Sequence, residues 1–393
     1  MKNRSIKVLF VFGTRPEAIK MVPVIQEMKD QSPKFKVVVC VTAQHREMLD
    51  QVLSLFNIKP EYDLNIMTKR QSLPQLTANI LLKATEVMKK ENPDIVFVQG
   101  DTTTTFAAVQ AAFYLKIPIA HIEAGLRTGK KYSPFPEEIN RRLTSVMADF
   151  HFAPTERAKR NLIAEDYKES SIFVTGNTVI DALLTVIRSQ KPEVRKKSLE
   201  KHFQEKWNLI LSNDSDNSKL ILVTGHRRES FGEGFKRICE ALRILAENNP
   251  DVQIVYPVHL NPNIQEPVYS ILGDIDNIHL ISPLDYDPFV YLMSQSYLIL
   301  TDSGGIQEEA PTLGVPVLVM RDTTERPEGI EAGSAKLVST NIDTITAEAQ
   351  NLLDNRSECK KMSKVANPYG DGKASKRIMK IIDDYFRRKR YDK

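Results

Sequence analysis

The chain has 393 residues, of which 54 are basic and 50 acidic, and its net charge is only +4. This balance gives no reason to expect nucleic acid or a membrane surface as a partner, and no apolar run approaches the length of a bilayer-spanning helix. Because 393 residues exceed what one hydrophobic core usually holds, we expect two domains.

The start of the chain and its cysteines indicate the compartment. The N-terminus enters a predicted strand almost at once and shows no signal-peptide pattern. Cys40, Cys239 and Cys359 share no metal-ligand spacing. Cys40 lies in an apolar run and Cys239 in a helical pattern, so we expect both thiols to be buried. These features predict a cytoplasmic protein.

The first half of the chain alternates short apolar runs with helical patterns. Continuous runs of Val, Ile and Leu between helices are typical of a parallel sheet that helices cover on both faces. The predicted strands are Ile6–Phe12, Lys36–Thr42, Asp94–Gln99, Ile117–Ile122, Phe150–Ala153 and Ile172–Thr175, and the predicted helices include Pro16–Lys29, Glu47–Phe56, Gln75–Glu91 and Thr104–Leu115.

The second half repeats this scheme. Two such successions predict an α/β protein with two doubly wound, Rossmann-like domains. The charged segment 191–206 and the polar segment 212–218 place the domain boundary between Gly176 and Lys219. An amphipathic pattern over Ala374–Phe386 predicts a last helix that packs on the body. The predicted strands of this half are Lys219–Thr224, Val252–Val258, Ile278–Ile281, Tyr297–Thr301, Pro316–Met320 and Lys336–Val338.

The most informative stretch runs from Leu300 to Ala310 and reads Leu-Thr-Asp-Ser-Gly-Gly-Ile-Gln-Glu-Glu-Ala. Two glycines between a strand and a helix let the backbone approach a ligand closely, and the unpaired N–H groups of a helix start suit a phosphate. Glu308 and Glu309 just beyond could bind sugar hydroxyls. The combination favours a nucleotide-sugar diphosphate over a dinucleotide, although a plain glycine-containing turn gives the same pattern.

Polar side chains follow nearly every predicted strand. Ligands of open parallel sheets bind beyond the carboxyl ends of the strands, so we expect these side chains to gather at one edge of each sheet. Solvated loops are polar in any case, which leaves the shared location as the stronger argument. The residues in question are Arg15, Gln44, Asp101, Glu123, Arg127, His226, Arg227, His259, the loop 302–305 and the segment 321–328.

Three carboxylates of the first half, Asp101, Glu123 and Glu137, are candidates for proton transfer. Carboxylates crowded in a partly closed site favour retention of a proton, which prepares one of them for general acid or base work. The alternative is that each pairs structurally with Arg127, Arg141 or Arg142. In the second half, His226 could exchange a proton near neutral pH, hold a phosphate, or be structural.

Other kinds of chemistry find little support. The seven histidines include no pair at helical ligand spacing, and no Cys-x-x-Cys occurs. There is no Gly-x-Ser-x-Gly elbow and no Gly-x-Gly-x-x-Gly after the first predicted strand. We therefore expect no metal and no cofactor, which leaves proton transfer and elimination.

Eight sequence motifs occur in a fixed order along the chain. They are Gly13-Thr-Arg-Pro-Glu-Ala-Ile-Lys20, Thr42-Ala-Gln-His-Arg-Glu-Met-Leu-Asp50, Gly100-Asp-Thr-Thr-Thr104, His121-Ile-Glu-Ala-Gly-Leu-Arg127, Pro134-Phe-Pro-Glu-Glu-Ile-Asn-Arg141, Gly176-Asn-Thr-Val-Ile-Asp181, Thr224-Gly-His-Arg-Arg-Glu229 and Asp302-Ser-Gly-Gly-Ile-Gln-Glu-Glu309. Together they closely resemble the non-hydrolysing UDP-N-acetylglucosamine 2-epimerases. The resemblance extends from about Val8 to the last predicted helix.

This resemblance implies a glycosyltransferase-B-like fold, with two Rossmann-like domains facing a central cleft. The implied domains are 1–180, 181–366 with the UDP site, and a C-terminal helix within 367–393 that crosses back to the first domain. The implied partner is a small-molecule nucleotide sugar, in an enzyme that is usually a homodimer and serves cell-surface polysaccharide biosynthesis. The implied reaction interconverts UDP-N-acetylglucosamine and UDP-N-acetylmannosamine by elimination and re-addition of UDP through a 2-acetamidoglucal intermediate.

The resemblance also implies roles for individual residues. The matched catalytic positions are Asp101, Glu123, Glu137 and His226. The matched substrate- and UDP-binding positions are Arg15, Lys20, Phe289, Ser303, Gly304, Gly305, Glu309 and Arg326. Bacterial relatives are activated by their own substrate at a second site, whose matched positions are Gln44, Arg70, Gln71, Arg227 and His259.

One position departs from the family pattern. A glutamine that some members place near the uracil is Leu284 here, while Phe289 is kept and can still stack on the base. Relatives that act on modified sugars such as diacetamido-uronic acids therefore stay an alternative. A glycosyltransferase of the same fold would use the same nucleotide loop, but neither it nor a nucleotide-sugar sensor needs three clustered carboxylates.

Overall fold

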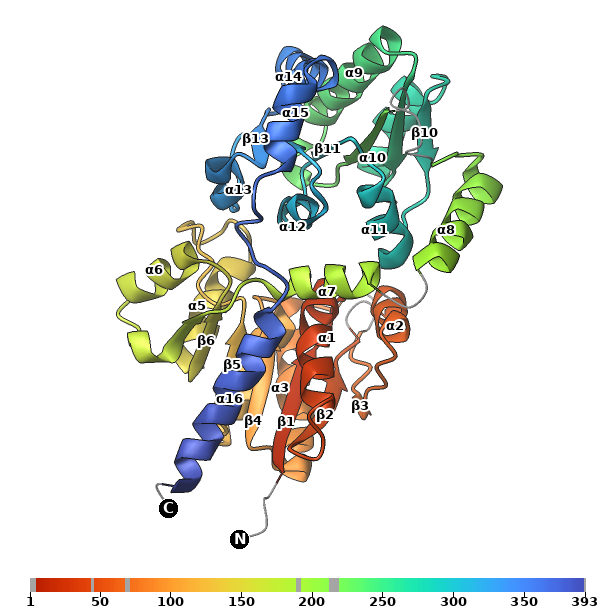
Figure 1. Ribbon diagram of the computed structural model, residues 1–393. Coiled ribbons are helices and arrows are strands. Elements are labelled where there is room, and N and C mark those ends of the chain that lie inside the picture. Colours follow the sequence, from red (N-terminus) through yellow and green to blue (C-terminus); the bar gives the residue numbers. More distant parts are fainter. Residues whose placement is uncertain (1–4, 44–45, 68–70, 189–191, 212–218, 392–393) are drawn as a thin grey trace. The chain divides into compact units, whose positions relative to one another are not determined.

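The computed structural model describes residues 5–43, 46–67, 71–188, 192–211 and 219–391. The chain forms two compact units, the first made of residues 1–184 and 369–393 and the second of residues 185–368 (Figure 1). Each unit contains one parallel sheet, so the expected α/β architecture with two Rossmann-like domains is confirmed. No helix of the described chain is both long and apolar enough to cross a membrane.

The first unit is built on a seven-stranded sheet with the order β3-β2-β1-β4-β5-β6-β7. Its strands are β1 (Ile6–Phe12), β2 (Phe35–Val41), β3 (Tyr62–Asp63), β4 (Ile95–Gln99), β5 (Ile119–Ile122), β6 (Phe150–Ala153) and β7 (Ile172–Val174). Its helices are α1 (Arg15–Lys29), α2 (Arg46–Leu55), α3 (Leu73–Glu91), α4 (Thr103–Tyr114), α5 (Glu137–Met147), α6 (Glu156–Ala164), η1 (Glu169–Ser171) and α16 (Ala374–Tyr391), with α7 (Thr178–Ile187) at the boundary.

The second unit has a six-stranded sheet with the order β10-β9-β8-β11-β12-β13. Its strands are β8 (Lys219–Thr224), β9 (Val252–Pro257), β10 (Ile278–Ile281), β11 (Leu298–Thr301), β12 (Val317–Val319) and β13 (Ala335–Leu337). Its helices are α8 (Pro192–Trp207), η2 (Arg228–Ser230), α9 (Glu233–Asn248), α10 (Pro262–Leu272), α11 (Tyr286–Ser294), α12 (Gly304–Glu309), η3 (Ala310–Leu313), α13 (Pro327–Ala332), α14 (Ile342–Asp354) and α15 (Arg356–Ser363).

The predicted strands agree with the observed ones to within a residue or two, and four of them match at both ends. The agreement follows from burial, since central strands such as β4 are buried along their whole length and therefore read as unbroken apolar runs. Strand β3 and helix α8 are two of the described elements that the sequence did not predict. Strand β3 has only two residues, too few to give a pattern, and the charged segment near the boundary forms helix α8.

The two cysteine side chains expected in the core are there. Cys40 and Cys239 are fully buried among the aliphatic side chains of their units. Burial raises the pKa of each thiol to about 12, so neither is a reactive thiolate at neutral pH.

The last helix packs against the first unit, where α16 lies beside α1 (Figure 1). Its start is fixed by Asp181, a buried residue of α7 that accepts hydrogen bonds from the backbone N–H groups of Ala374 (3.2 Å) and Ser375 (2.8 Å) and from the Ser375 hydroxyl (2.5 Å). The arriving segment is held by Tyr369, whose carbonyl accepts the N–H of Asn177 at 2.7 Å. A remote carboxylate thus caps the helix and satisfies donors that a helix start leaves unpaired.

We predict that Asp181→Ala loosens this attachment. Two buried N–H groups and a hydroxyl would lose their acceptor, which should lower the free energy of unfolding by about 1–3 kcal/mol. Urea unfolding measures the loss, and hydrogen exchange should show faster opening at the start of α16. The control is Asp371→Ala, which removes an exposed ion pair with Arg377 and should cost less than about 1 kcal/mol. Equal losses in the two variants would contradict the assigned role.

Candidate functional site

The candidate site residues of the first unit follow three adjacent strands. Strand β1 pairs with β4, and β4 pairs with β5, so the turns after them are neighbours at one edge of the sheet. The turn after β1 needs Gly13, because a Cβ there would lie 1.9 Å from the Thr42 hydroxyl oxygen. Helix α1 then begins with Arg15 and carries Lys20 one turn later.

Glu123 follows β5 and forms an ion pair with Lys20. Both side chains are about nine-tenths buried. The amide of Asn177 donates a longer hydrogen bond, 3.4 Å, to the same carboxylate oxygen. Glu123 itself has a φ of +64°, a conformation that costs energy in residues other than glycine. The surrounding structure therefore holds this carboxylate in an enforced position.

Asp101 follows β4 and forms an ion pair with Arg141 of α5. Arg141 also contacts the buried Glu138 at 3.3 Å, and the amide of Asn140 donates to the Asp101 carbonyl at 3.0 Å. Glu137 is the first residue of α5 and is half-buried. The turn after β4 and the start of α5 therefore bring Asp101 next to α5.

The alternative that arginines pair structurally with the candidate carboxylates thus applies in part. Arg141 does neutralise a predicted site carboxylate, whereas the other two arginines bind elsewhere. Arg127 and Arg142 both pair with Glu165, at 2.8 and 3.2 Å. The sequence suggested carboxylates crowded together, and the structure gives Asp101 and Glu123 a cationic partner each.

Sequence reasoning did not single out Glu17. Its side chain is fully buried and accepts the backbone N–H groups of Gly13 (3.0 Å) and Thr14 (2.8 Å). It also contacts the hydroxyls of Thr102 and Thr105, beside Asp101. The pattern Thr14-x-x-Glu17 is a capping box, a signal that could have identified it.

In the second unit the central residue is Asp302, which follows β11 and has no exposed side-chain surface. Its Oδ2 accepts the backbone N–H groups of His226 (2.7 Å) and Arg227 (2.8 Å), which follow the neighbouring strand β8. Its Oδ1 lies 3.1 Å from Nδ1 of His226. Burial alone would raise the pKa of Asp302, but the His226 ring and the two N–H groups outweigh it and hold the pKa below its ordinary value.

His259 follows β9, on the other side of β8, and its ring lies 6.1 Å from that of His226. Its Nδ1 accepts the N–H of Asn261 at 3.1 Å, so the proton of the neutral ring is on Nε2. Burial and the nearby His226 lower the pKa of His259, which favours that neutral form. The two rings and Asp302 form one polar cluster at the edge of the second sheet.

The loop expected to bind a nucleotide, residues 302–305, begins with Asp302 of this cluster. Helix α12 begins at Gly304, directly after Ser303, as the sequence predicted. Glu309 is buried and accepts a hydrogen bond from the Tyr286 hydroxyl at 2.5 Å. Tyr286 and Phe289 both belong to α11, and Phe289 is half-buried. The contact therefore joins α11 to the end of the loop and helix.

Arg326 belongs to a charged network in the same unit. It pairs with Glu308 and lies 3.7 Å from Glu325, while Arg227 and Arg321 approach Glu325 to 3.2 and 2.6 Å. Burial opposes ionisation of Glu325, yet Arg326, Arg321 and Arg227 together lower its pKa to about 2. The network therefore stays charged at neutral pH.

Some residues predicted for the second substrate site cannot be placed. Gln44 and Arg70 lie outside the described residues, and Gln71, just before α3, is half-buried in the first unit. Arg227 and His259 belong to the second unit and follow adjacent strands. The structure therefore places three of these five residues, and the second substrate site stays a prediction.

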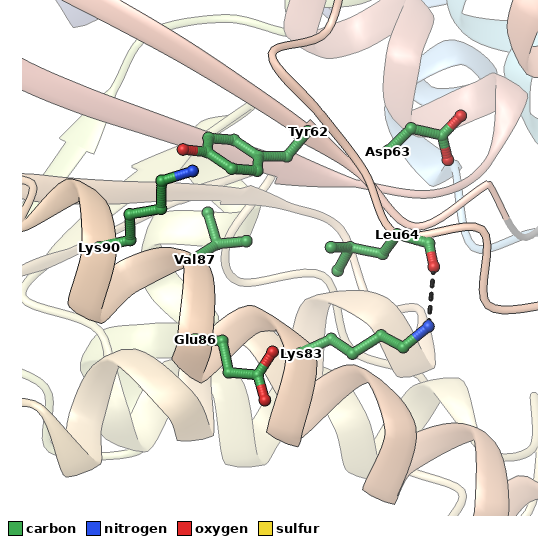
Figure 2. Close-up of a pocket in the computed structure, with 7 residues that line it drawn as sticks. All are labelled: Tyr62, Asp63, Leu64, Lys83, Glu86, Val87 and Lys90. Atoms are coloured by element: carbon green, nitrogen blue, oxygen red, sulfur yellow. Dashed lines mark hydrogen bonds between the residues drawn. The ribbon is translucent and has the colours of Figure 1, made fainter.

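A hollow of about 360 Å³ lies between β3 and α3 (Figure 2). The Lys83 ammonium donates to the Leu64 carbonyl at 3.0 Å, and the Lys90 ammonium lies 5.1 Å from the centre of the Tyr62 ring. This hollow contains none of the predicted site residues. Its lining consists of Tyr62, Asp63, Leu64, Lys83, Glu86, Val87 and Lys90.

Comparison with known proteins decides the family. Residues 26–383 match the family model described as UDP-N-acetylglucosamine 2-epimerase. The UDP-N-acetylglucosamine 2-epimerase of Salmonella typhimurium is 55% identical over 380 residues, which cover 97% of this chain and 99% of the relative. The chain belongs to the UDP-N-acetylglucosamine 2-epimerase family. It is accordingly an epimerase, and therefore an isomerase.

Solved epimerase structures share its fold. The crystal structure of UDP-GlcNAc 2-epimerase from Neisseria meningitidis bound to UDP-GlcNAc is 54% identical, has a TM-score of 0.89, and covers 96% of this chain and 99% of that one. A Methanocaldococcus jannaschii epimerase in complex with UDP-GlcNAc and UDP is 33% identical, with a TM-score of 0.79 and coverage of 96% and 99%. MurG from Acinetobacter baumannii, 17% identical with a TM-score of 0.60, shares the fold alone.

We predict that Asp302→Asn destabilises this epimerase in a pH-dependent way. The folded pKa of Asp302 lies below the value of about 4 in an unfolded chain. The stabilisation of the folded state by ionised Asp302 is therefore fully present above that value. It is lost as the pH falls through the folded pKa. At neutral pH the variant should lose about 1–3 kcal/mol, and the gap to the wild type should narrow in acid.

Unfolding free energies measured at neutral and acidic pH test this. Asp285→Asn, at an exposed acid before α11, is the control and should differ little from the wild type at either pH. A gap between Asp302→Asn and the wild type that stays constant with pH would exclude the charged form as the source of stability.

Proposed function

We propose that this epimerase interconverts UDP-N-acetylglucosamine and UDP-N-acetylmannosamine by inverting C2 of the sugar. The observation that carries the proposal is the cluster at the edge of the first sheet. There, Glu123 is held by Lys20, and Asp101 by Arg141, after adjacent strands. Two positioned carboxylates can take and return a proton, and two cations balance their charge. The relatives named for this activity, over nearly the whole chain, support the substrate.

The proposed reaction proceeds in two halves. A carboxylate removes the proton from C2 while the bond between C1 and the phosphate oxygen breaks, which releases UDP and leaves a 2-acetamidoglucal with a C1–C2 double bond. UDP then re-forms the C1–O bond as C2 receives a proton on the opposite face. No oxidation occurs and no water is consumed. Asp101, Glu123 and Glu137 are the proposed acids and bases, and His226 the proposed catalytic residue of the second unit.

Proton exchange at C2 tests the reaction directly. Incubation with UDP-N-acetylglucosamine in D2O should place deuterium at C2 of both epimers, followed by NMR, because the removed proton exchanges with solvent. Formation of the epimer without deuterium at C2 would exclude proton removal. Absence of any turnover, with turnover of a UDP-diacetamido-uronic acid instead, would assign the protein to relatives that act on modified sugars.

We predict that Asp101→Asn, Glu123→Gln and Glu137→Gln fold normally and lose turnover. Each variant keeps the shape of the side chain and removes a group that can exchange a proton, so kcat should fall by about 10²–10⁴-fold. Circular dichroism and thermal unfolding control for folding. Glu169, an exposed acid that pairs with Lys159, offers a matched control, and Glu169→Gln should keep wild-type turnover. Wild-type rates in all three carboxylate variants would refute the assignment.

The second unit is the proposed UDP-binding part. Backbone N–H groups of Gly304 and Gly305, with Ser303, suit the diphosphate, and Arg326 adds positive charge. Phe289 can stack on the uracil, and Glu309 can accept the ribose hydroxyls. The hydrogen bond from Tyr286 supports this role for Glu309, because it fixes a buried carboxylate beside the loop. Arg15 and Lys20 are the proposed contributors from the first unit.

We predict a graded loss of UDP affinity in this part of the protein. Glu309→Ala removes a charged acceptor and should weaken binding by about 1.5–3 kcal/mol. Tyr286→Phe removes only the hydrogen bond that orients Glu309 and should weaken UDP binding less. Glu266→Ala, an exposed acid of α10, is the control. Calorimetry measures UDP binding, and equal affinity in all four proteins would count against this site.

We also propose that the epimerase is a homodimer. Large apolar side chains are exposed on α3, α4 and α5, which pack side by side in the first unit. They are Leu82, Phe113, Tyr114 and Val146, each more than half exposed. A surface of this kind is typical of a protein–protein interface. Sedimentation of the purified protein as a monomer at micromolar concentration would contradict the proposal.

Regulation by substrate is a further part of the proposal. A second molecule of UDP-N-acetylglucosamine would activate the enzyme, with Gln44, Arg70, Gln71, Arg227 and His259 as the candidate residues. The short separation of the His259 and His226 rings supports it, since a ligand at one ring can influence the other. Rate curves should be sigmoidal in the wild type and flatter in His259→Ala. Hyperbolic wild-type curves would refute the regulation and leave the epimerase activity standing.

A further inference from the structure

Glu17 is a buried carboxyl group whose hydrogen-bond partners are all uncharged. Its Oε2 accepts two backbone N–H groups from the turn between β1 and α1. Its Oε1 lies 2.6 Å from the Thr102 hydroxyl oxygen and 3.1 Å from that of Thr105, both after β4. One side chain thus joins the turns that carry Lys20 and Asp101, two candidate site residues. A buried carboxylate without a cation is costly.

Counting the hydroxyl protons shows which form of Glu17 fits. The Thr105 hydroxyl lies 2.6 Å from the Gln99 carbonyl, which can only accept, so the single Thr105 proton goes there. The Thr105 oxygen therefore has only lone pairs to offer to Oε1 of Glu17. An ionised Oε1 would face those lone pairs, whereas a protonated one would not, since its proton can be donated.

A protonated Glu17 completes a continuous chain of donors and acceptors. Its Oε1–H donates to the Thr105 oxygen at 3.1 Å, the Thr105 hydroxyl donates to the Gln99 carbonyl at 2.6 Å, and the Thr102 hydroxyl donates to Oε1 at 2.6 Å. The Thr105 backbone N–H also donates to the Thr102 oxygen at 3.1 Å. Every hydroxyl in the chain then has one acceptor for its one proton.

Burial agrees with this assignment. Burial raises the pKa of Glu17 against the opposing effect of hydrogen bonds from Thr102, Thr14 and the backbone. The charged groups on the surrounding elements are Arg15 and Lys20 on α1, Asp101 after β4 and Glu123 after β5. Since Lys20 lies three residues beyond Glu17 on α1 and binds Glu123, a second negative charge at position 17 would compete for it.

We propose that Glu17 is a positioning residue that works in its neutral, protonated form. Its carboxylic acid joins the β1–α1 turn to the β4–α4 turn by hydrogen bonds and so positions Lys20 and Asp101. It adds no charge to the cluster that Lys20, Glu123, Asp101 and Arg141 form. The inference about catalysis rests on the proposed function, whereas the protonation state of Glu17 can be tested without it.

Three substitutions distinguish a neutral hydrogen-bonding group at position 17 from a charged one. In Glu17→Gln the amide oxygen can accept both N–H groups and the amide N–H can donate to the threonines, so kcat and its pH profile should stay within about twofold of wild type. Glu17→Asp keeps the acid but is too short to span both turns. Glu17→Leu keeps the bulk and loses every hydrogen bond. Both should lower kcat by about 10²-fold.

A second measurement reports the proton itself. A carboxyl whose pKa is higher in the folded than in the unfolded chain makes the wild type lose stability as the pH rises above about 4. Glutamine has no such loss, so the melting temperature of Glu17→Gln should rise relative to wild type from about pH 5 to about pH 8. The opposite trend would show that Glu17 is ionised in the folded protein.

The outcomes can be told apart. High activity in Glu17→Asp together with low activity in Glu17→Gln would overturn the proposal, because it would require a charge or an exchangeable proton at this position. If the wild type does not act on UDP-N-acetylglucosamine, the proposed function fails, yet the melting temperatures still decide the protonation state. If Glu17→Leu does not fold, the comparison of the glutamine and aspartate variants still decides it.

Discussion

The pairing of each unit's first strand with a strand from later in the chain determines where the candidate chemistry lies. In the first unit β1 pairs with β2 on one side and with β4 on the other, and in the second β8 pairs with β9 and β11. At such a switch point the turns leave toward opposite faces of the sheet, which makes room for a ligand at the carboxyl ends. Many candidate side chains follow these strands, among them Asp101, His226 and Ser303, whereas Glu123 follows β5 and Arg326 follows β12.

Charge compensation is the second constraint on both units. Asp101, Glu123 and Glu325 are each held beside cations, and Asp302 is held by the His226 ring and two backbone N–H groups. Ions removed from water lose hydration that only a close partner restores. Glu17, whose hydrogen-bond partners among the described residues are all uncharged, differs from these acids, and the proposed bound proton accounts for it. The same physics thus yields ion pairs at some buried acids and a neutral acid at another.

The first unit is assembled from two distant parts of the chain. Helix α16 returns to it, and its start is built around Asp181, nearly two hundred residues earlier. The backbone N–H of Asn177 donates to the Tyr369 carbonyl, and the side-chain amide of Asn177 donates to Glu123. Asn177 therefore links the segment where the chain returns to the first unit with Glu123, a candidate catalytic carboxylate.

The amino-acid sequence by itself determined the strands, the α/β class and most candidate residues. Apolar runs in strands buried on both faces, and motifs in turns, are local patterns that one stretch of chain carries. It also indicated the glycine loop at 304–305 and Glu309 as parts of a nucleotide site, which stays a prediction. The very short β3 and the charged α8 gave no such pattern.

Only the tertiary structure decided which side chains meet. The partners Lys20 and Glu123 are about a hundred residues apart, as the tie between Asp181 and Ser375 is nearly two hundred. No local pattern can encode such pairs, because they depend on strand order and on where each turn ends. The protonation state proposed for Glu17 is the clearest case. Its capping-box pattern is visible in the sequence, but only burial and the direction of two threonine hydroxyls assign it a proton.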